Sequence, residues 1–379
     1  MTAAGLPAPL LLGFTVAAIG GPIALISIFP GVAGDGADSA GLVVALSLAV
    51  FVAPLAIWLA YSRRVVSDGG LTAFVADAAG RRVAIAQGWI WALAYFLYLP
   101  YTITFVVYDL LPPVFPGIHA YRAALELILP VAIIAFVALP LRVVLIVLGL
   151  LAAAEVIVLL VLAGFEYAHA GSTFAAHPNV NDTGRAVGGT ALLYVCASLP
   201  LYLGGAVRGG ARTMRWVLAA GVAIVGAVFL VSAIPMSGVP DSLRDAAVPG
   251  AAIARAYSGR GLEVAVGLLT ALGTLALVVA EYVALARLLR WMHAIPLRVS
   301  YAWIAVPFIA LDAISLIDPD RFYDDALKPS LGALFVSQIA VYAVFPRVRR
   351  SPVALAAVLV SSALFGWGLY TLIAGSAST

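Results

Sequence analysis

Two glutamates, Glu155 and Glu281, lie deep inside long apolar stretches of the sequence. At 1.5 Å per residue, Glu155 lies about 20 Å along a helix from Arg142, and Glu281 lies about 9 Å from the next basic residue, Arg287. A charged carboxylate at such a depth in a bilayer costs about 2.5–3.5 kcal/mol, whereas the neutral acid costs far less. Each glutamate therefore has the chemistry of a group that takes up and releases a proton. The competing interpretations are a structural hydrogen bond for Glu155 and an ion pair with a nearby arginine for Glu281.

Hydroxyl groups accompany one of these acids. Thr270 and Thr274 precede Glu281 on the same face of a predicted helix. We predict that Glu155, Glu281, Thr270 and Thr274 couple an ion to the function of the chain, with H⁺ favoured and Na⁺ as the alternative. The four histidines, at 119, 169, 177 and 293, lack the spacing of metal ligands. We therefore expect no bound metal and no cofactor other than the coupling ion.

Two apolar stretches are interrupted by glycine and proline at the depth where a membrane helix should be continuous. The first interruption is AIGGPIAL at 18–25, and the second is CASLPLYLGG at 196–205. Irregular backbone at this depth is tolerated only where it lines a cavity or is buried in protein. Paired interruptions in the two halves of a chain are typical of the binding site of a transporter. The alternative is that Pro22 and Pro200 only kink two helices.

Unwound turns expose backbone groups that bind charged ligands. The N–H groups at the start of a half-helix suit a carboxylate, and freed carbonyl groups suit an ammonium group or a cation. Glycine lets a ligand approach the backbone closely, because it has no Cβ. The candidate substrate-binding residues are therefore Gly20, Gly21, Pro22 and Ile23 in the first break, and Ser198, Leu199, Leu201, Tyr202 and Gly204 in the second.

An aromatic stripe in the third apolar stretch adds further candidates. Trp91, Tyr95, Tyr98 and Thr102 recur at helical spacing. Tyrosine rings and hydroxyl groups offer contacts to a substrate ammonium group. Tyr98, Tyr101 and Thr102 lie deepest, and these are the members that we assign to the substrate site. Packing, or a belt at the membrane interface, is the interpretation that we favour for the rest of the stripe.

The elements that position these residues are membrane helices. Apolar residues make up 64% of the chain, charged residues make up only 10%, and the mean hydropathy is +1.10. A soluble domain has about 25% charged residues. Hydropathy over a window of about 19 residues predicts an all-α membrane protein with about eleven spans, at 10–29, 41–61, 84–111, 125–141, 143–166, 187–207, 216–236, 261–287, 300–317, 330–346 and 353–374.

Loop charges predict how these spans are oriented. With the N-terminus inside, the inner loops hold fourteen arginines and the outer loops hold seven basic residues, which is the positive-inside pattern. Eleven spans then place the C-terminus outside. Arginine almost replaces lysine and alanine is abundant, which is typical of a GC-rich bacterial genome. We therefore expect a protein of a bacterial inner membrane, with a cytoplasmic N-terminus and an extracytoplasmic C-terminus.

The order and spacing of several motifs resemble the amino acid–polyamine–organocation (APC) superfamily. SDGGLTAFVADAAGRRVAIAQGWIWALAYFLYLPY at 67–101 is similar to its inner loop and third helix, and ARLLRWMHAIPLR at 286–298 is similar to its loop after helix eight. GGPI at 20–23 stands where its break in helix one is expected. The resemblance implies a single transmembrane domain over 1–379 with the leucine-transporter fold. Its two inverted repeats of five helices would span 10–166 and 187–346, with an extra helix at 353–374.

The resemblance also bears on the coupling ion. Glu155 stands where several members place a lysine near the cation site, which implies the same part with the opposite charge sign. Sodium-coupled relatives usually carry adjacent hydroxyl groups on helix eight, and their absence here favours a proton. Many members have an acid just after the break in helix six, whereas this chain has Leu201-Tyr202-Leu203-Gly204-Gly205. Substrate identity is therefore not transferable from the family.

These features predict a secondary active transporter that moves amino acids or related amines by alternating access, coupled to protons. The alternatives are sodium-coupled transport or exchange of another small organic solute, and, less favoured, a membrane enzyme or a channel. No phosphate-binding glycine loop occurs in a soluble context, so we do not expect an enzyme. The expected partners are a small-molecule substrate and the lipid bilayer. The net charge of +3 is too small to indicate nucleic acid, and the oligomeric state is left open.

Overall fold

The computed structural model describes residues 5–376, which contain helices and no β-strand. The α-helices are α1 (Ala8–Ala18), α2 (Pro22–Ala33), α3 (Ala40–Tyr61), α4 (Gly70–Ala79), α5 (Arg81–Phe105), α6 (Arg122–Val137), α7 (Leu141–Ala170), α8 (Val180–Leu192), α9 (Gly210–Met236), α10 (Asp241–Arg244), α11 (Pro249–Ser258), α12 (Arg260–His293), α13 (Leu297–Ser315), α14 (Pro319–Val344) and α15 (Pro352–Ser376). Tighter or wider helical segments are η1 (Gly34–Ser39), η2 (Val106–Leu110), η3 (Pro116–Tyr121), η4 (Leu193–Ala206) and η5 (Phe345–Arg347).

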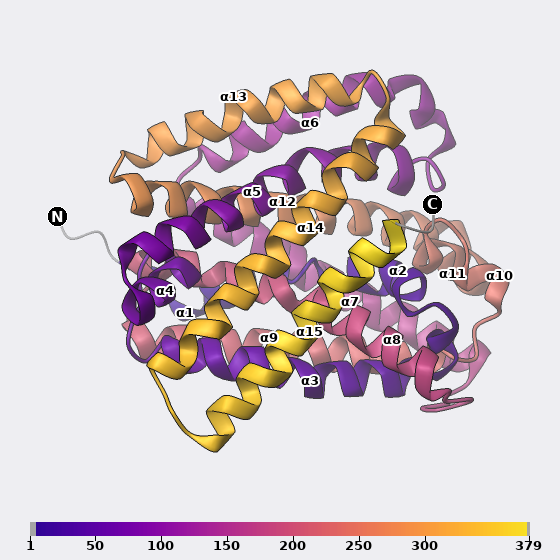
Figure 1. Cartoon of the computed structure of the whole chain (residues 1–379). Coiled ribbons are helices and arrows are strands. Elements are labelled where there is room, and N and C mark those ends of the chain that lie inside the picture. Colours follow the sequence, from indigo (N-terminus) through magenta and orange to yellow (C-terminus); the bar gives the residue numbers. More distant parts are fainter. Residues whose placement is uncertain (1–4, 377–379) are drawn as a thin grey trace.

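The long helices run between two ends of the bundle, which we name by the short helices found there. The α4 end carries α4 and the start of α1, and the α11 end carries α10 and α11 (Figure 1). Ten segments within the described residues are long and apolar enough to cross a membrane. The first, Ala8–Tyr61, has 54 residues and makes two passes, because α1 and α2 run toward the α11 end and α3 runs back. The predicted all-α membrane fold with about eleven helices is thus confirmed.

Most predicted spans agree with the helices to within a few residues, but the tenth begins much earlier than expected. Its predicted range was 330–346, whereas α14 begins at Pro319. Asp320, Asp324 and Asp325 lie in the first turns of α14 and are exposed. These charges lower the mean hydropathy of the segment, so a hydropathy window does not detect a helix that starts outside the apolar layer.

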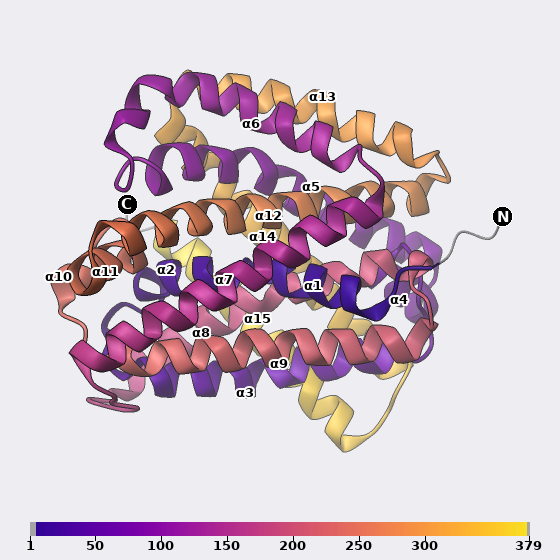
Figure 2. The same ribbon diagram turned by 180° about the vertical axis from the view of Figure 1, so that it is seen from behind.

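The helices are arranged around a buried centre. α6 and α13 lie side by side along one edge of the molecule, and α3 and α9 lie together along the opposite edge (Figures 1 and 2). Between these edges, α1, α2 and η4 all contact α12, and both α1 and α2 also contact α7. α12 is buried on every face from Ala276 to Leu289, which explains why this part of its sequence is apolar all round rather than amphipathic.

Candidate functional site

The first predicted break is a non-helical turn in the structure. α1 ends at Ala18 and α2 begins at Pro22. Between them, Gly20 has a φ of +91° and Gly21 has a φ of +64°. Other L-residues adopt this left-handed region at a cost of about 1–2 kcal/mol, so the turn requires the glycine pair.

The second predicted break lies within η4, which is a 3₁₀ helix over all 14 of its residues. Runs of 3₁₀ helix longer than three or four residues are uncommon, and a run in the middle of a helix often marks a functional hinge. Pro200 lies inside η4, and the segment continues α8 directly. The two apolar stretches that the sequence singled out therefore both depart from α-helical geometry.

A cavity of about 130 Å³ lies beside both departures. Its wall is formed by the Ile19–Gly20 turn and by parts of α2, α5, α8, η4, α12 and α14. The wall is mostly apolar, and its polar side chains are Tyr95, Tyr98, Cys196, Thr274, Glu281 and Ser330. Of the site residues predicted from the sequence, Gly20, Tyr98, Thr274 and Glu281 line this cavity. A single carboxyl group thus faces a pocket made largely of aliphatic and aromatic groups.

On the cavity wall, the sulfur atom of Cys196 lies between Glu281 and Tyr95 and is hydrogen-bonded to both. The hydroxyl group of Tyr95 donates to Sγ of Cys196 over 3.8 Å, and Cys196 donates to Oε1 of Glu281 over 3.9 Å. Oε2 of Glu281 has no hydrogen-bond partner within the described residues. Arg287, the nearest basic residue on α12, pairs with Asp68 at 2.9 Å instead. One oxygen of the Glu281 carboxyl group therefore has no hydrogen-bond partner within the described residues, and Arg287 does not pair with it.

An aromatic stack supports the cavity wall from behind. The ring of Trp91 lies 4.1 Å from the ring of Tyr95 and 4.2 Å from the ring of Tyr202, measured between centroids. Tyr202 was predicted as a substrate contact, but it does not line the cavity. Its place in the structure is to hold Tyr95 through Trp91.

Glu155 lies near the first break, outside the cavity wall. Its side chain on α7 is fully buried, and neither carboxylate oxygen has a hydrogen-bond partner within the described residues. A β-carbon on Gly21 would overlap Oε2, and a β-carbon on Gly273 of α12 would lie 2.7 Å from Oε1. The acid thus occupies space that two glycines leave open between α7, the first break and α12.

The other residues predicted for the site lie around the cavity in the core. Ser198 donates to the carbonyl oxygen of Val195 over 3.0 Å, and Thr270 lies 3.1 Å from Ser27 between the two hydroxyl oxygens. The ring of Tyr101 lies 4.9 Å from that of Tyr98. The remaining members are buried away from the cavity wall: Gly21, Pro22, Ile23, Thr102, Leu199, Leu201 and Gly204.

Sequence reasoning did not select three of the polar residues on the cavity wall. Tyr95 belonged to the aromatic stripe, but depth in the membrane favoured other members. Cys196 stands at the start of the second break, where its position was a usable signal. Ser330 lies inside α14, where it donates to the carbonyl oxygen of Ala94 over 2.7 Å. The helix was predicted to start at residue 330, so Ser330 was expected at the boundary of the membrane span, where a cavity contact was not expected.

Solved structures of other proteins share this arrangement of helices. MhsT in complex with L-phenylalanine superposes with a TM-score of 0.65 at 14% sequence identity, over 96% of this chain and 97% of that chain. A mutant of the Eremococcus coleocola manganese transporter superposes with a TM-score of 0.61 at 12% identity, over 97% of this chain and 87% of that chain. The chain has the leucine-transporter fold. No protein-family model and no curated protein matches the sequence.

Contacts among four segments connect the α4 end of this leucine-transporter fold. Asp68 accepts from Arg287 of α12 over 2.9 Å and from the backbone N–H of Gly205 over 3.0 Å. Leu6 forms the isolated backbone bridge with Val207, through bonds of 2.7 Å to the carbonyl oxygen of Ala206 and 3.0 Å from the N–H of Arg208. These contacts join four segments, which are the residues just before α1, the end of η4, the loop before α4, and α12.

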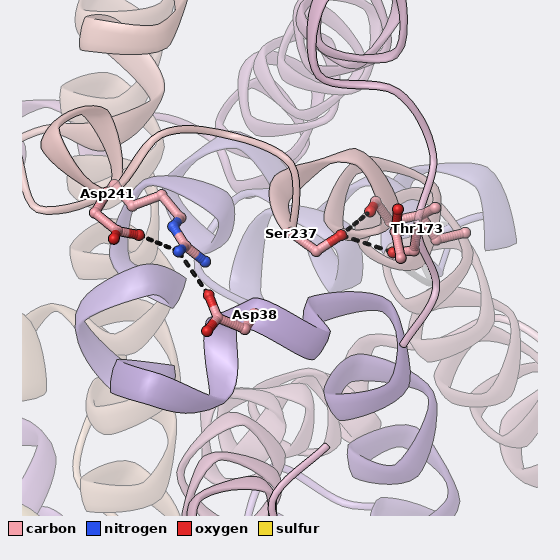
Figure 3. A network of polar contacts seen from close by, with 6 residues as sticks. Asp38, Thr173, Ser237 and Asp241 are labelled. Carbon is pink, nitrogen blue, oxygen red and sulfur yellow. Dashed lines mark hydrogen bonds and ion pairs between the residues drawn. The ribbon is translucent and has the colours of Figure 1, made fainter. Parts of the chain in front are cut away.

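A polar network connects loops at the α11 end. Arg244 pairs with Asp38 at 2.6 Å and also with Asp241, while Ser237 donates to the carbonyl oxygen of Thr173 over 2.7 Å (Figure 3). Burial alone would lower the pKa of Arg244, but its hydrogen bonds to Asp241 and Asp38 outweigh that effect and raise the pKa overall. The ion pairs join η1, which follows α2, to α10.

Proposed function

We propose that this protein is a secondary active transporter that moves a small organic solute by alternating access. The supporting observation is the cavity of about 130 Å³ beside two irregular helical segments, with one carboxyl group on its wall. Substrate sites of inverted-repeat transporters lie near the midplane of the membrane, where discontinuous helices meet. Contacts at the α4 end and at the α11 end supply closures that alternate in such a cycle.

The cavity chemistry favours a substrate with an ammonium group, that is, an amino acid or a related amine. Among the described residues that line the cavity, Glu281 is the only acid, and none is a lysine, arginine or histidine. The rings of Tyr95 and Tyr98 offer π faces to a cation. The remaining wall is aliphatic and suits the apolar part of a small molecule.

A transition-metal substrate has less support. Within the described residues no group of three or more His, Cys, Asp or Glu side chains is placed to hold a metal ion. Cys196 and Glu281 are only two ligand side chains of this kind, whereas tightly held metal sites usually take three or four. The likeness to a manganese transporter therefore supports only the fold, and the substrate that we propose is an organic molecule.

Protons are the proposed coupling ion, with Glu281 and Glu155 as the coupling acids. Both side chains are fully buried, and both have carboxylate oxygens that lack a partner within the described residues. Glu155 contacts the first break, and Glu281 contacts the cavity, so movement of the broken helices changes the surroundings of both. Thr274 lines the same cavity as Glu281 and donates to the carbonyl oxygen of Thr270 over 2.8 Å, and the hydroxyl oxygen of Thr270 lies 3.1 Å from that of Ser27. Sodium coupling and exchange remain the alternatives.

The finer assignments form part of the same proposal. Membership of the APC superfamily is proposed from the motifs at 67–101, 286–298 and 20–23, together with the fold. The division into repeats at 10–166 and 187–346, with an extra helix at 353–374, is proposed from the two breaks. The charge distribution over the loops supports an orientation with the α4 end cytoplasmic, and the arginine- and alanine-rich composition supports a bacterial inner membrane.

Proteoliposomes with an inward proton gradient test this function. Internal acidification is followed while amino acids and amines are added, for the native chain and for Glu155→Gln, Glu281→Gln and Glu166→Gln. Glu166 provides the matched control, because it is equally buried on α7 but lies neither at the break nor in the cavity. Substrate-dependent acidification that either coupling variant abolishes, and that Glu166→Gln retains, supports the proposal. Substrate flux without proton entry would contradict proton coupling and favour sodium coupling or exchange. Absence of flux with every compound would contradict the transporter assignment.

A further inference from the structure

A second pair of buried acids lies on two helices, α6 and α13, that contribute no residue to the cavity wall. Glu126 belongs to α6 and Asp312 belongs to α13, and the two helices lie side by side along one edge of the molecule (Figures 1 and 2). Both side chains are fully buried, and neither lines the cavity. The hydroxyl oxygen of Ser315 lies 2.8 Å from Oε1 of Glu126 and 2.8 Å from the carbonyl oxygen of Asp312, so the two acidic residues approach one another where α6 packs on α13. Two ionised acids at such a place in a bilayer would need a compensating positive charge.

Two hydroxyl groups complete this cluster from two helices. Thr104 of α5 donates to Oε1 of Glu126 over 2.5 Å, and Ser315 of α13 donates to the same oxygen over 2.8 Å. Distances of about 2.5–2.7 Å are typical of hydroxyl groups that donate to an ionised acceptor. Oε1 of Glu126 therefore accepts from two hydroxyl groups, an arrangement that stabilises the ionised form. The hydroxyl groups orient the carboxylate but supply no net charge.

Three carboxylate oxygens of the cluster remain without a partner. Oε2 of Glu126 and both Oδ atoms of Asp312 are buried and have no hydrogen-bond partner within the described residues. A single proton would satisfy one of these oxygens and leave the others without a donor. A metal cation, in contrast, coordinates several oxygens at once.

No side chain supplies the missing positive charge. Arg122 lies one turn before Glu126 on α6, but its guanidinium group donates to the carbonyl oxygen of Tyr108 over 3.3 Å. Its guanidinium carbon also lies 5.1 Å from the centre of the Tyr108 ring. Within the described part of the chain, no ion pair includes Glu126 or Asp312. The arginine nearest in sequence is thus held by Tyr108 of η2.

We propose that Glu126 and Asp312, with the hydroxyl groups of Thr104 and Ser315, bind a single hard metal cation between α5, α6 and α13. Carboxylate, hydroxyl and carbonyl oxygens are the ligands that Na⁺, Ca²⁺ and Mg²⁺ prefer, and the cluster offers no nitrogen or sulfur. The carbonyl oxygen of Asp312 already accepts from Ser315 over 2.8 Å, so it lies at the same place. The cation fastens the two edge helices to α5 and is separate from the coupling ion of the transport cycle.

Binding is tested on the purified full-length chain in lipid nanodiscs after treatment with a chelator. NaCl, CaCl₂ and MgCl₂ are titrated in turn at constant ionic strength set by choline chloride, and the unfolding temperature is recorded. A ligand that binds only the folded state raises the unfolding temperature in a saturable manner. We expect one of the three cations to raise it by several degrees, and equilibrium binding of that cation as a radioisotope to give one site per chain.

Variants then locate the bound cation. Glu126→Gln and Asp312→Asn should each abolish the shift, whereas Glu166→Gln, which removes an unpartnered carboxyl group from α7, should retain it. Ser315→Ala removes one hydroxyl ligand and should weaken binding about tenfold, so it decides the matter if the charge variants do not fold. Absence of any saturable shift in the native chain overturns the proposal, because the pair is then two neutral acids. A shift that Ser315→Ala and both charge variants leave unchanged also overturns it.

Discussion

The carboxylate of Glu155 fills the space that Gly21 leaves by having no side chain. A β-carbon at Gly21 would overlap Oε2 of Glu155, and Gly273 bounds the same carboxylate on the side of α12. Because neither oxygen is hydrogen-bonded within the described residues, shape rather than polar contacts holds the acid in place. Any movement of the turn between α1 and α2 therefore changes the environment of Glu155 directly.

Gly21→Ala should abolish transport and lower thermal stability. The left-handed φ costs alanine about 1–2 kcal/mol, and the added methyl group displaces the Glu155 carboxylate. Gly31→Ala in α2 is the matched control, because its β-carbon meets nothing within 4 Å and alanine is favoured in a helix by about 0.5–1 kcal/mol. Thermal unfolding and proteoliposome uptake check both variants. Equal behaviour of the two would show that Gly21 has no special role.

Glu281→Gln should weaken binding of ammonium substrates by about ten- to a hundredfold, because a charged hydrogen-bonding partner contributes about 1.5–3 kcal/mol. Glu263→Gln makes the same change on the same helix, at a residue that pairs with Arg255 and Arg260 at the α11 end. Its effect on substrate affinity should be small. Isothermal titration with amines and amino acids measures both. An unchanged affinity in Glu281→Gln would remove the carboxyl group from the substrate site.

Asp68→Asn should open the cavity toward the α4 end. The substitution weakens the pairing with Arg287, whose side chain is 7% exposed, and the bond from the Gly205 N–H. Cys196 is the single cysteine of the chain and lies on the cavity wall, so its reaction with a maleimide confined to the α4 side reports the opening. We expect labelling to become several-fold faster.

Asp77→Asn is the control for that measurement. Its partner Arg64 is 52% exposed, and exposed ion pairs contribute about 0–1 kcal/mol. Labelling of Cys196 should therefore stay at the native rate. A similar acceleration by Asp77→Asn would mean that loss of any acid near α4 loosens this end, and that Asp68 is not a specific closure.

Arg244→Gln should have the opposite sidedness. Its loss releases Asp38 and Asp241, and η1 is then no longer tied to α10. Maleimide applied from the α11 side should reach Cys196 several-fold faster, while labelling from the α4 side stays unchanged. Arg321→Gln, which breaks an exposed pair with Asp325, is expected to change neither rate. Faster labelling from both sides would indicate general destabilisation rather than a closure.

Local sequence rules were sufficient for the all-α membrane class and the first break, whereas the leucine-transporter fold was expected from the resemblance of the motifs at 67–101, 286–298 and 20–23. The length of the apolar stretches sets the number of spans, and Gly20-Gly21-Pro22 interrupts a helix wherever it occurs. The α14 start was missed because a hydropathy window averages the charges of its first turns with the apolar residues that follow. These charges lie in the first turns of α14, and charges at the start of a helix are compatible with helical structure.

The composition of the cavity wall depends on how the helices are rotated against each other. Tyr98 lines the cavity and Thr102, one turn further on, does not. Cys196 meets Glu281 only because η4 packs on α12, and Ser315 reaches Glu126 only because α6 lies beside α13. Spacing along a single helix identifies a face, but it does not say which residue of a distant helix that face will meet.

The 3₁₀ geometry of η4 makes this segment longer than an α-helix of the same sequence. At about 2.0 Å per residue instead of 1.5 Å, its 14 residues span about 7 Å more. Each turn that converts to α-helix would draw its ends together by about 2 Å while the backbone keeps its hydrogen bonds. The segment would then act as an extensible rod, in which the stroke comes from a change of pitch and the two ends of the bundle need no separate hinge.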